Sequence, residues 1–334
     1  MRNPILPIAD PFVTYFEGSY YITGTGTGTS VRIWASARLT SIGDAAGALV
    51  WAPQEGQPLR DIWSPSMFLL PYKGAEYWFI YVTASIDDTY EGHRLYVLQS
   101  QGRDPLGPYT FKGRVAGVED ATAIDPSLLR VHGALYLLYV KADGANITYI
   151  ARLSDPLTQG GAETPLIYPD QPWERGMNAA EGGVALPDES AVPHHTQPTY
   201  PVAEGPTALY YEGRTFIAYS GSHTGNKTYC VGLLVYDGQG DPLRQESWTK
   251  KGPVFRYSAA NGVYGPGRAT FTTSPDATEH WMVYHAKASA AFTVDGRTAR
   301  AQRFMWNEDG TPDFGVPMSL ETDVVPPSGE MGTG

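Results

Sequence analysis

The stretch Ile124-Asp125-Pro126-Ser127-Leu128-Leu129-Arg130-Val131 decides the fold, because the chain repeats its pattern five times. In each copy a proline marks a strand start, and an aromatic-rich strand follows several residues later, here Tyr136-Leu137-Leu138-Tyr139. The five prolines are Pro11, Pro65, Pro126, Pro206 and Pro266. A repeat with a long period, here roughly 60 residues, is the signature of a repeating architecture.

Each repeat is typical of a small antiparallel sheet. In the third repeat we expect strands over residues 127–131, 135–141 and 146–153, with a turn at His132-Gly133. Proline suits the first residue of a strand because it has no N–H to give to the neighbouring strand. Short strands with Gly-rich turns, repeated at this period, favour the blades of a propeller over a sandwich. The sequence therefore predicts an all-β, five-bladed β-propeller that forms a single domain over residues 1–334.

The composition supports an all-β protein and excludes several kinds of partner. The chain has 22 Tyr, 11 Phe and 8 Trp together with 37 Gly and 27 Pro, which suits short strands and tight turns. Its formal net charge of −11 argues against nucleic acid, whose phosphates need clustered Lys and Arg. No apolar span approaches the roughly 20 residues of a transmembrane helix. We expect neither nucleic acid nor membrane as a partner.

The single cysteine and the first residues bear on the compartment. Cys230 has no partner for an internal disulfide and is expected to be a small buried residue. The start Met-Arg-Asn-Pro lacks the apolar region of a signal peptide. We expect the protein to be cytoplasmic, or secreted with a leader removed. The sequence leaves the oligomeric state open.

Three of the five strand starts carry an acidic residue: Asp10, Asp125 and Glu204. Equivalent points of different blades meet at one mouth of a propeller's channel, so the repeat brings these distant carboxylates together. Hydrolysis of a glycosidic bond needs such a set, because one carboxyl protonates the leaving oxygen and another activates water or attacks carbon. A lone Asp-Pro is more simply a turn residue, but three acids in register favour a site.

The chain resembles glycoside hydrolase family 43 in segments that carry these acids. They are Ile8-Ala9-Asp10-Pro11, Ala123-Ile124-Asp125-Pro126-Ser127 and Ala203-Glu204-Gly205-Pro206, with further matches at Trp63-Ser64-Pro65 and from Tyr229 to Leu234. The likeness runs from Asp10 to Pro317. It implies a five-bladed propeller enzyme that inverts configuration. By resemblance Asp10 is the general base, Glu204 the general acid, and Asp125 tunes the pKa of the acid and positions it.

The resemblance also implies residues that bind the substrate. Arg297 matches a fifth-blade arginine that reaches into the pocket and binds sugar hydroxyls; a solvated hairpin arginine is the simpler alternative. Trp63 matches a pocket tryptophan, for which core packing is the alternative. We treat two similar segments as decoys: Trp51, in Trp-Ala-Pro, and Glu181, which lacks a following proline at the matching position.

The chain departs from the family at the start of the fifth blade. Many members have Gly-Pro-Gly-His there, and that histidine belongs to a central calcium site, whereas this chain has Gly265-Pro266-Gly267-Arg268. A guanidinium has only donors and cannot bind a cation. We therefore expect no cofactor, doubt a central calcium, and place Arg268 in the substrate pocket as the source of positive charge. The adjacent His194 and His195, in the long insertion over residues 164–202, more simply lie on the surface than bind a metal.

The resemblance implies an exo-acting α-L-arabinofuranosidase. Its substrates would be arabinan, arabinoxylan or their oligosaccharides. A β-xylosidase is the close alternative, because xylopyranose presents similar hydroxyl groups to the same pocket. Related sucrose-cleaving enzymes would have Arg-Asp-Pro and Glu-Cys motifs, where this chain has Ile-Asp-Pro and Glu-Gly-Pro. A non-catalytic carbohydrate-binding propeller is the alternative from another class, but it would repeat similar sites in every blade.

Overall fold

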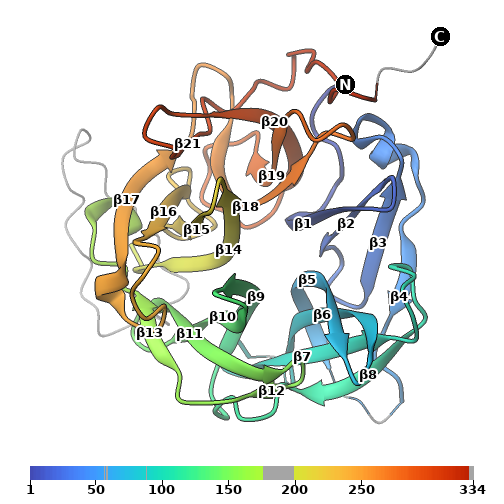
Figure 1. Ribbon diagram of the computed structural model, residues 1–334. Coiled ribbons are helices and arrows are strands. Elements are labelled where there is room, and N and C mark those ends of the chain that lie inside the picture. Colours follow the sequence, from blue (N-terminus) through green and yellow to red (C-terminus); the bar gives the residue numbers. More distant parts are fainter. Residues whose placement is uncertain (56, 58, 88, 176–198, 331–334) are drawn as a thin grey trace.

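Five antiparallel sheets surround one axis in the computed structural model of this protein (Figure 1). The structure describes residues 1–55, 57, 59–87, 89–175 and 199–330. Each sheet is one blade of a propeller, and its first four strands follow one another in sequence order from the axis outward (Figure 1). The predicted all-β, five-bladed β-propeller is confirmed.

The blades take up consecutive parts of the chain. Blade 1 contains β1 (Ala9–Phe16), β2 (Ser19–Thr25), β3 (Val31–Ser36) and β4 (Ala48–Trp51). Blade 2 contains β5 (Arg60–Tyr72), β6 (Ala75–Ser85), β7 (His93–Ser100) and β8 (Tyr109–Arg114). Blade 3 contains β9 (Ala123–Val131), β10 (Ala134–Ala142), β11 (Asn146–Asp155), β12 (Thr158–Gln159) and β13 (Thr164–Ile167). Blade 4 contains β14 (Ala203–Tyr211), β15 (Arg214–Gly221), β16 (Cys230–Tyr236) and β17 (Trp248–Phe255). Blade 5 contains β18 (Tyr264–Thr273), β19 (His280–Lys287), β20 (Thr298–Trp306) and β21 (Pro312–Asp313).

Contacts between the first and last blades close the ring. The N-terminal segment adds to blade 5, because the N–H of Ile5 donates to the carbonyl of Ala299 (2.8 Å) and the N–H of Ala299 donates to the carbonyl of Leu6 (2.9 Å). The terminal amino group of Met1 also donates to the carbonyl of Val324 (2.8 Å). Closure covers strand edges that would otherwise be free to pair.

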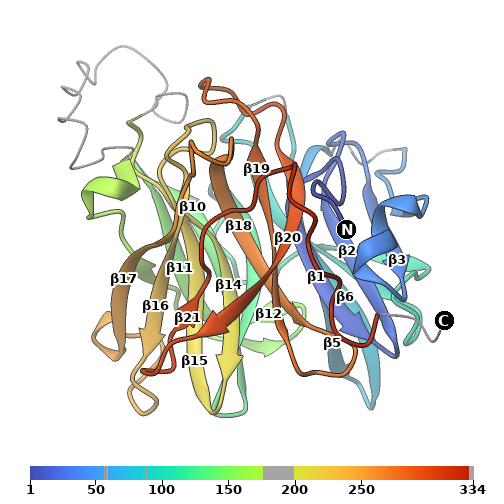
Figure 2. The same ribbon diagram turned by 90° about the horizontal axis from the view of Figure 1, so that it is seen from above.

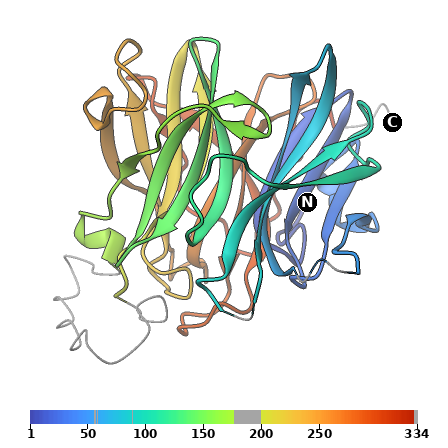
Figure 3. The same cartoon turned by 90° about the horizontal axis from the view of Figure 1, so that it is seen from below.

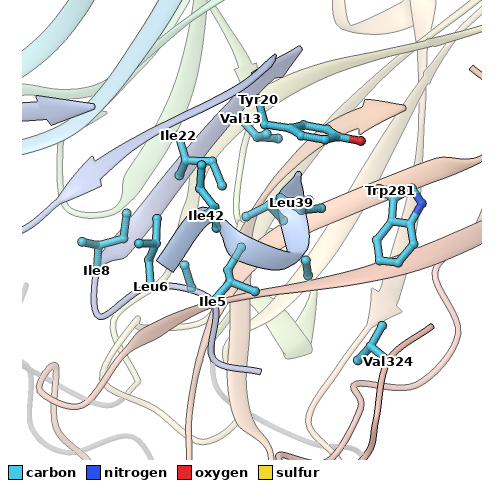
Figure 4. Packing of buried hydrophobic residues seen from close by; sticks show 13 residues of the cluster. Ile5, Leu6, Ile8, Val13, Tyr20, Ile22, Leu39, Ile42, Trp281 and Val324 are labelled. Atoms are coloured by element: carbon cyan, nitrogen blue, oxygen red, sulfur yellow. The ribbon is translucent and has the colours of Figure 1, made fainter. Parts of the chain in front are cut away.

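The hydrophobic core lies between neighbouring blades. Five clusters of buried side chains fill the five spaces between the sheets. In the cluster between blades 1 and 5, Ile22 and Val13 face Trp281 across the joint, and Ile42 of the short 3-10 helix η1 (Leu39–Asp44) covers one end (Figure 4). Blades 2 and 3 stand next to each other in the same way (Figures 1 and 3). Each blade therefore depends on both of its neighbours for burial.

Each inner strand carries a β-bulge at its proline. The residue before each proline has a left-handed backbone with φ between 47° and 61°: Asp10, Ser64, Asp125, Gly205 and Gly265. The register of the sheet shifts at the same points. The expectation that the proline begins the strand is wrong, since β9 already begins at Ala123. A bulge leaves residues outside the ladder, so the proline's missing N–H costs no hydrogen bond within the strand.

Helices contribute little to the fold. Within the described ranges they are short 3-10 turns: η1, η2 (Pro172–Arg175) and η4 (Gln245–Ser247). None of the helices in the described ranges has the length and apolar character needed to cross a membrane. Cys230, at the start of β16, is buried as expected.

Candidate active site

One cavity collects the predicted carboxylates. It has a volume of about 680 Å³ and receives side chains from all five blades. The sequence-predicted residues among them are Asp10, Trp63, Asp125, Glu204 and Arg297. A second cavity, of about 600 Å³, is lined mainly by apolar side chains such as Phe12, Met67 and Phe271. The first cavity is therefore the candidate active site.

The bulges place the carboxylates. Asp10 and Asp125 are themselves the left-handed residues of their strands. Aspartate tolerates this conformation better than most residues, because its short polar side chain can bond locally. Glu204 lies one residue earlier in its strand, and Gly205 takes the left-handed position, where a Cβ would lie 2.8 Å from Cδ of Arg268. The third acid is thus offset by one residue from the equivalent point predicted by the repeat.

Asp10 is held as a carboxylate. Its Oδ1 lies 3.3 Å from Nη1 of Arg297, and its Oδ2 accepts a hydrogen bond from the hydroxyl of Thr25 (2.6 Å). Its N–H donates to Nδ1 of the buried His285 (3.0 Å). Burial alone raises the pKa of Asp10, but the nearby positive charge, chiefly that of Arg297, outweighs it and holds the pKa well below its usual range. An ionised carboxylate beside a polar cavity can accept a proton from water.

Glu204 has the opposite character. Its Oε2 accepts a hydrogen bond from Nδ2 of Asn146 (2.8 Å), and its Oε1 accepts one from the hydroxyl of Tyr229 (2.9 Å). Burial, followed by the charge of Asp125, raises the pKa of Glu204 to about 8 despite these hydrogen bonds. The side chain is therefore protonated at neutral pH and can give its proton to a leaving group.

Asp125 links the acid to the rest of the site. Its N–H donates to the hydroxyl of Thr83 (3.0 Å), and its Oδ2 accepts the N–H of Gly205 (3.0 Å), the residue after Glu204. The second bond ties the inner strands of blades 3 and 4 together at the acid. Asp125 thus fixes the backbone at Glu204 and supplies a negative charge that favours the protonated acid.

Trp63 and Arg297 line the wall of the cavity. The indole of Trp63 stacks on the ring of His93, with centroids 3.9 Å apart and planes 26° apart. Besides Asp10, Nη1 of Arg297 reaches the hydroxyl of Thr224 (3.3 Å), and its Nε donates to the carbonyl of Val294 (2.8 Å). An aromatic face and a cation with free donor capacity are groups that bind sugars. The decoy Trp51 lies in the outer strand β4, stacked on Phe111.

Arg268 lies behind the carboxylates rather than among the side chains that line the cavity. It is 3% exposed, and its Nη2 is 3.8 Å from Oδ1 of Asp125. A guanidinium in this place presents only N–H donors, so the position does not fit a calcium ligand. In the described part of the chain, no group of three or more His, Cys, Asp and Glu side chains is placed to hold a metal ion. The other candidates, Glu181, His194 and His195, lie outside the described residues.

The segment that leads into β14 is anchored on blade 4. The ring of Trp173, in η2, fills a slot beside Gly221, Gly232 and Gly252, where a Cβ at any of them would lie 2.4 to 2.6 Å from the indole. The next residue, Glu174, is fully buried. Its carbonyl accepts the N–H of Val202 (3.0 Å), close before Glu204.

The carboxylate of Glu174 completes this anchor. It accepts hydrogen bonds from the hydroxyl of Tyr219 (2.6 Å) and from Nζ of Lys250 (2.9 Å). Removing a partner from such a buried cluster is costly, because the groups left behind remain without water. The chain therefore enters the acid's strand from a fixed position.

Sequence reasoning missed the groups that bond to the carboxylates. Nothing in the sequence marks a role for Asn146, Thr25 or His285, and Tyr229 stands out only as part of a segment that resembles the family. Asn146 begins β11 at the same mouth of the channel as the acids. This position at a strand start is the one feature of the sequence that could have indicated its role. The contacts join residues far apart in the chain, such as Asp10 and His285, so no local pattern marks them.

Comparisons with known proteins identify similar glycoside hydrolases. The model of glycosyl hydrolases family 43 matches residues 1–312. An extracellular exo-α-(1→5)-L-arabinofuranosidase of Streptomyces avermitilis is 30% identical over 325 residues, covering 93% of this chain and 62% of that protein. Alpha-L-arabinofuranosidase 43 of Humicola insolens is 29% identical over 333 residues, covering 95% of this chain and 63% of that protein. The chain thus spans less than two thirds of the length of these two relatives.

A solved structure is similar over nearly its whole length. The α-L-arabinofuranosidase from Lactobacillus brevis has a TM-score of 0.83 and 27% identity, with 96% of this chain and 98% of that chain covered. A thermostable family-43 glycoside hydrolase has a TM-score of 0.78 at 23% identity, covering 98% of each chain, and shows the fold alone.

Proposed function

The chain belongs to glycosyl hydrolases family 43, and from this we propose that it is an exo-acting α-L-arabinofuranosidase that inverts configuration. Its substrates are arabinan, arabinoxylan or oligosaccharides of these. One observation carries the proposal: three carboxylates from blades 1, 3 and 4 share one cavity in which Glu204 is kept protonated and Asp10 ionised. The names of the relatives support the choice of sugar.

In the proposed mechanism the two acids divide the work. Glu204 protonates the oxygen of the leaving group, while Asp10 takes a proton from a water that attacks the anomeric carbon from the opposite side. Arg297 holds Asp10 ionised and donates hydrogen bonds to sugar hydroxyls. Trp63 packs against the C–H groups of the terminal sugar. Asp125 keeps Glu204 protonated and in place.

A panel of glycosides tests the function. We expect release of nitrophenol from 4-nitrophenyl α-L-arabinofuranoside in preference to the β-D-xyloside and the β-D-galactofuranoside. Preference for the xyloside would make the protein a β-xylosidase, and binding without turnover would make it a carbohydrate-binding propeller. Proton NMR of the first product should show the β-anomer of arabinose; an initial α-anomer would contradict inversion.

The location of the enzyme follows the same relatives. The relative from Streptomyces avermitilis is named as extracellular. This supports the second location considered from the sequence, secretion with loss of a leader.

Asp125 is expected to set the upper end of the pH profile. Activity needs protonated Glu204, so kcat/KM should be constant near neutral pH and fall as the pH rises through about 8. Asp125→Asn keeps the acceptor for Gly205 but removes a negative charge that raises the pKa of Glu204. The fall should therefore move to lower pH by about one unit. A pH series of kcat/KM on the arabinofuranoside measures it, and an unmoved profile would contradict the role of Asp125.

Metal removal is expected to leave the enzyme unchanged. Arg268 places a fixed positive charge beside Asp125 and can ligate no cation. We expect dialysis against a chelator to alter neither kcat/KM nor Tm. Loss of activity to the chelator with recovery on adding calcium would show that the protein uses a metal instead.

A further inference from the structure

Two exposed apolar side chains stand at the candidate active site. Among the described residues, Phe292 and Val294 are the large apolar side chains that line this cavity and are also exposed, at 46% and 48%. Both belong to the loop between β19 and β20, which projects beyond the ends of the strands (Figure 2). We call this pair the rim patch. A single exposed apolar residue needs no explanation, but this pair lies at the mouth of the cavity that holds the three carboxylates, where a ligand can cover it.

A buried lysine holds the rim patch in place. Lys287, the last residue of β19, is 1% exposed. Its Nζ donates to the carbonyls of Gly225 (2.5 Å), Ala291 (3.2 Å) and Thr293 (3.0 Å). The ammonium has three donors, and these three carbonyls use all of them. Lys287 thus fixes the loop between β19 and β20, which carries the rim patch, to the loop of blade 4 that contains Gly225.

Packing between the two loops fixes the ring of Phe292. The N–H of Thr293 donates to the carbonyl of Gly225 (3.0 Å). The ring of Phe292 lies against His223, with centroids 5.0 Å apart. A Cβ on Gly225 would lie 3.1 Å from Nδ1 of His223 and 3.2 Å from Cε2 of Phe292, so the absence of a side chain there lets the rings approach. An aromatic side chain held in this way loses little freedom when a ligand covers it.

The rim patch is joined to the reacting groups through Arg297. Its Nε donates to the carbonyl of Val294, while its Nη1 lies 3.3 Å from Oδ1 of Asp10. Asp125 and Glu204 are 7% and 8% exposed, and so they form the deep part of the cavity. The terminal sugar must occupy that deep part to reach the acids. Side chains that are nearly half exposed therefore meet the part of the substrate that leads out of the cavity.

We propose that the rim patch binds the sugar on the leaving-group side of the cleaved bond and makes the enzyme prefer a second arabinofuranosyl unit to a small alcohol. This proposal rests on the proposed arabinofuranosidase function and adds the residues that select its leaving group. A furanose presents C–H groups on its faces, and these pack on an aromatic ring and a branched aliphatic side chain. A methyl leaving group is too small to reach the patch.

Hydrolysis of two substrates by Phe292→Ala tests the proposal. One substrate is α-1,5-linked arabinobiose and the other methyl α-L-arabinofuranoside. We expect the ratio of kcat/KM for the disaccharide to kcat/KM for the methyl glycoside to fall about tenfold, mainly through KM of the disaccharide, which corresponds to about 1.4 kcal/mol. Leu49→Ala, which truncates an exposed side chain on outer strand β4, is the matched control and should leave the ratio unchanged.

A second variant tests whether Lys287 holds the rim patch in place. Lys287→Met removes the donor from three carbonyls, so it should lower the same ratio and also the Tm. An unchanged ratio in Phe292→Ala would overturn the rim proposal while the proposed function stands. If the wild-type protein hydrolyses neither substrate, the proposed function fails, and the rim proposal falls with it.

Discussion

Replacing Glu204 with glutamine is expected to lower kcat/KM for methyl α-L-arabinofuranoside about 10³-fold, since a general acid contributes about 10² to 10⁴. The methoxide leaving group needs a proton, and glutamine cannot supply it. A 2,4-dinitrophenyl leaving group is stable as an anion and needs little protonation. The decrease in kcat/KM for the 2,4-dinitrophenyl glycoside should therefore be about tenfold or less. Steady-state kinetics on both substrates measures the difference.

Stability separates this effect from misfolding. In wild type the pKa of Glu204 is about 8 in the folded state and near 4.5 when unfolded. The contribution of Glu204 to the free energy of unfolding is therefore fully present below about pH 4.5, and it is lost as the pH rises through about 8. Glutamine carries no charge to bury, so the variant should have an equal or higher Tm at pH 8. Glu246→Gln, at an exposed position, is the kinetic control. Equal losses on both substrates would show that Glu204 is not the acid.

Asp10→Asn is expected to lower kcat/KM by at least about 10³-fold on both substrates alike. Water must lose a proton whichever group leaves, and an amide cannot accept one. The variant keeps the size of the side chain and an acceptor for Thr25. The ratio between the two substrates should therefore stay at the wild-type value, in contrast to the Glu204 variant.

A matched control completes the Asp10 experiment. Asp44→Asn makes the same chemical change at an exposed residue of η1 and should keep full activity. If Asp10→Asn instead loses activity only on the methyl glycoside, Asp10 acts on the leaving group, and the roles of the two acids are exchanged.

The repeat predicted the blades but not the bulges. A long-period pattern of strands and turns carries information about how many sheets form, and each sheet formed where a repeat was found. A bulge depends on one residue taking a left-handed backbone within a strand. Pro126 was therefore read as a strand start, although β9 already runs through Ala123 and Ile124. A proline is compatible both with the first residue of a strand and with a bulge inside a strand, so its presence does not distinguish the two.

The site was predictable where residues repeat and unpredictable where they meet by packing. Asp10 and Asp125 stand at equivalent points of their repeats, so their meeting followed from the fold. Arg268 instead lies two residues after the proline of its repeat, and its side chain lies behind Asp125 rather than in the cavity. The hydrogen bond from Asn146 to Glu204 depends on the orientation of two blades, which no segment of sequence contains.

The anchor at Trp173 and Glu174 makes the insertion that follows an exchangeable module. Because the carbonyl of Glu174 already holds the N–H of Val202, the two ends of the segment between them stay together whatever its length. Each doubling of a closed loop then costs only about 0.6 kcal/mol of chain entropy. A change in the length of that segment should therefore cost little stability and leave the acid, two residues beyond Val202, in its position.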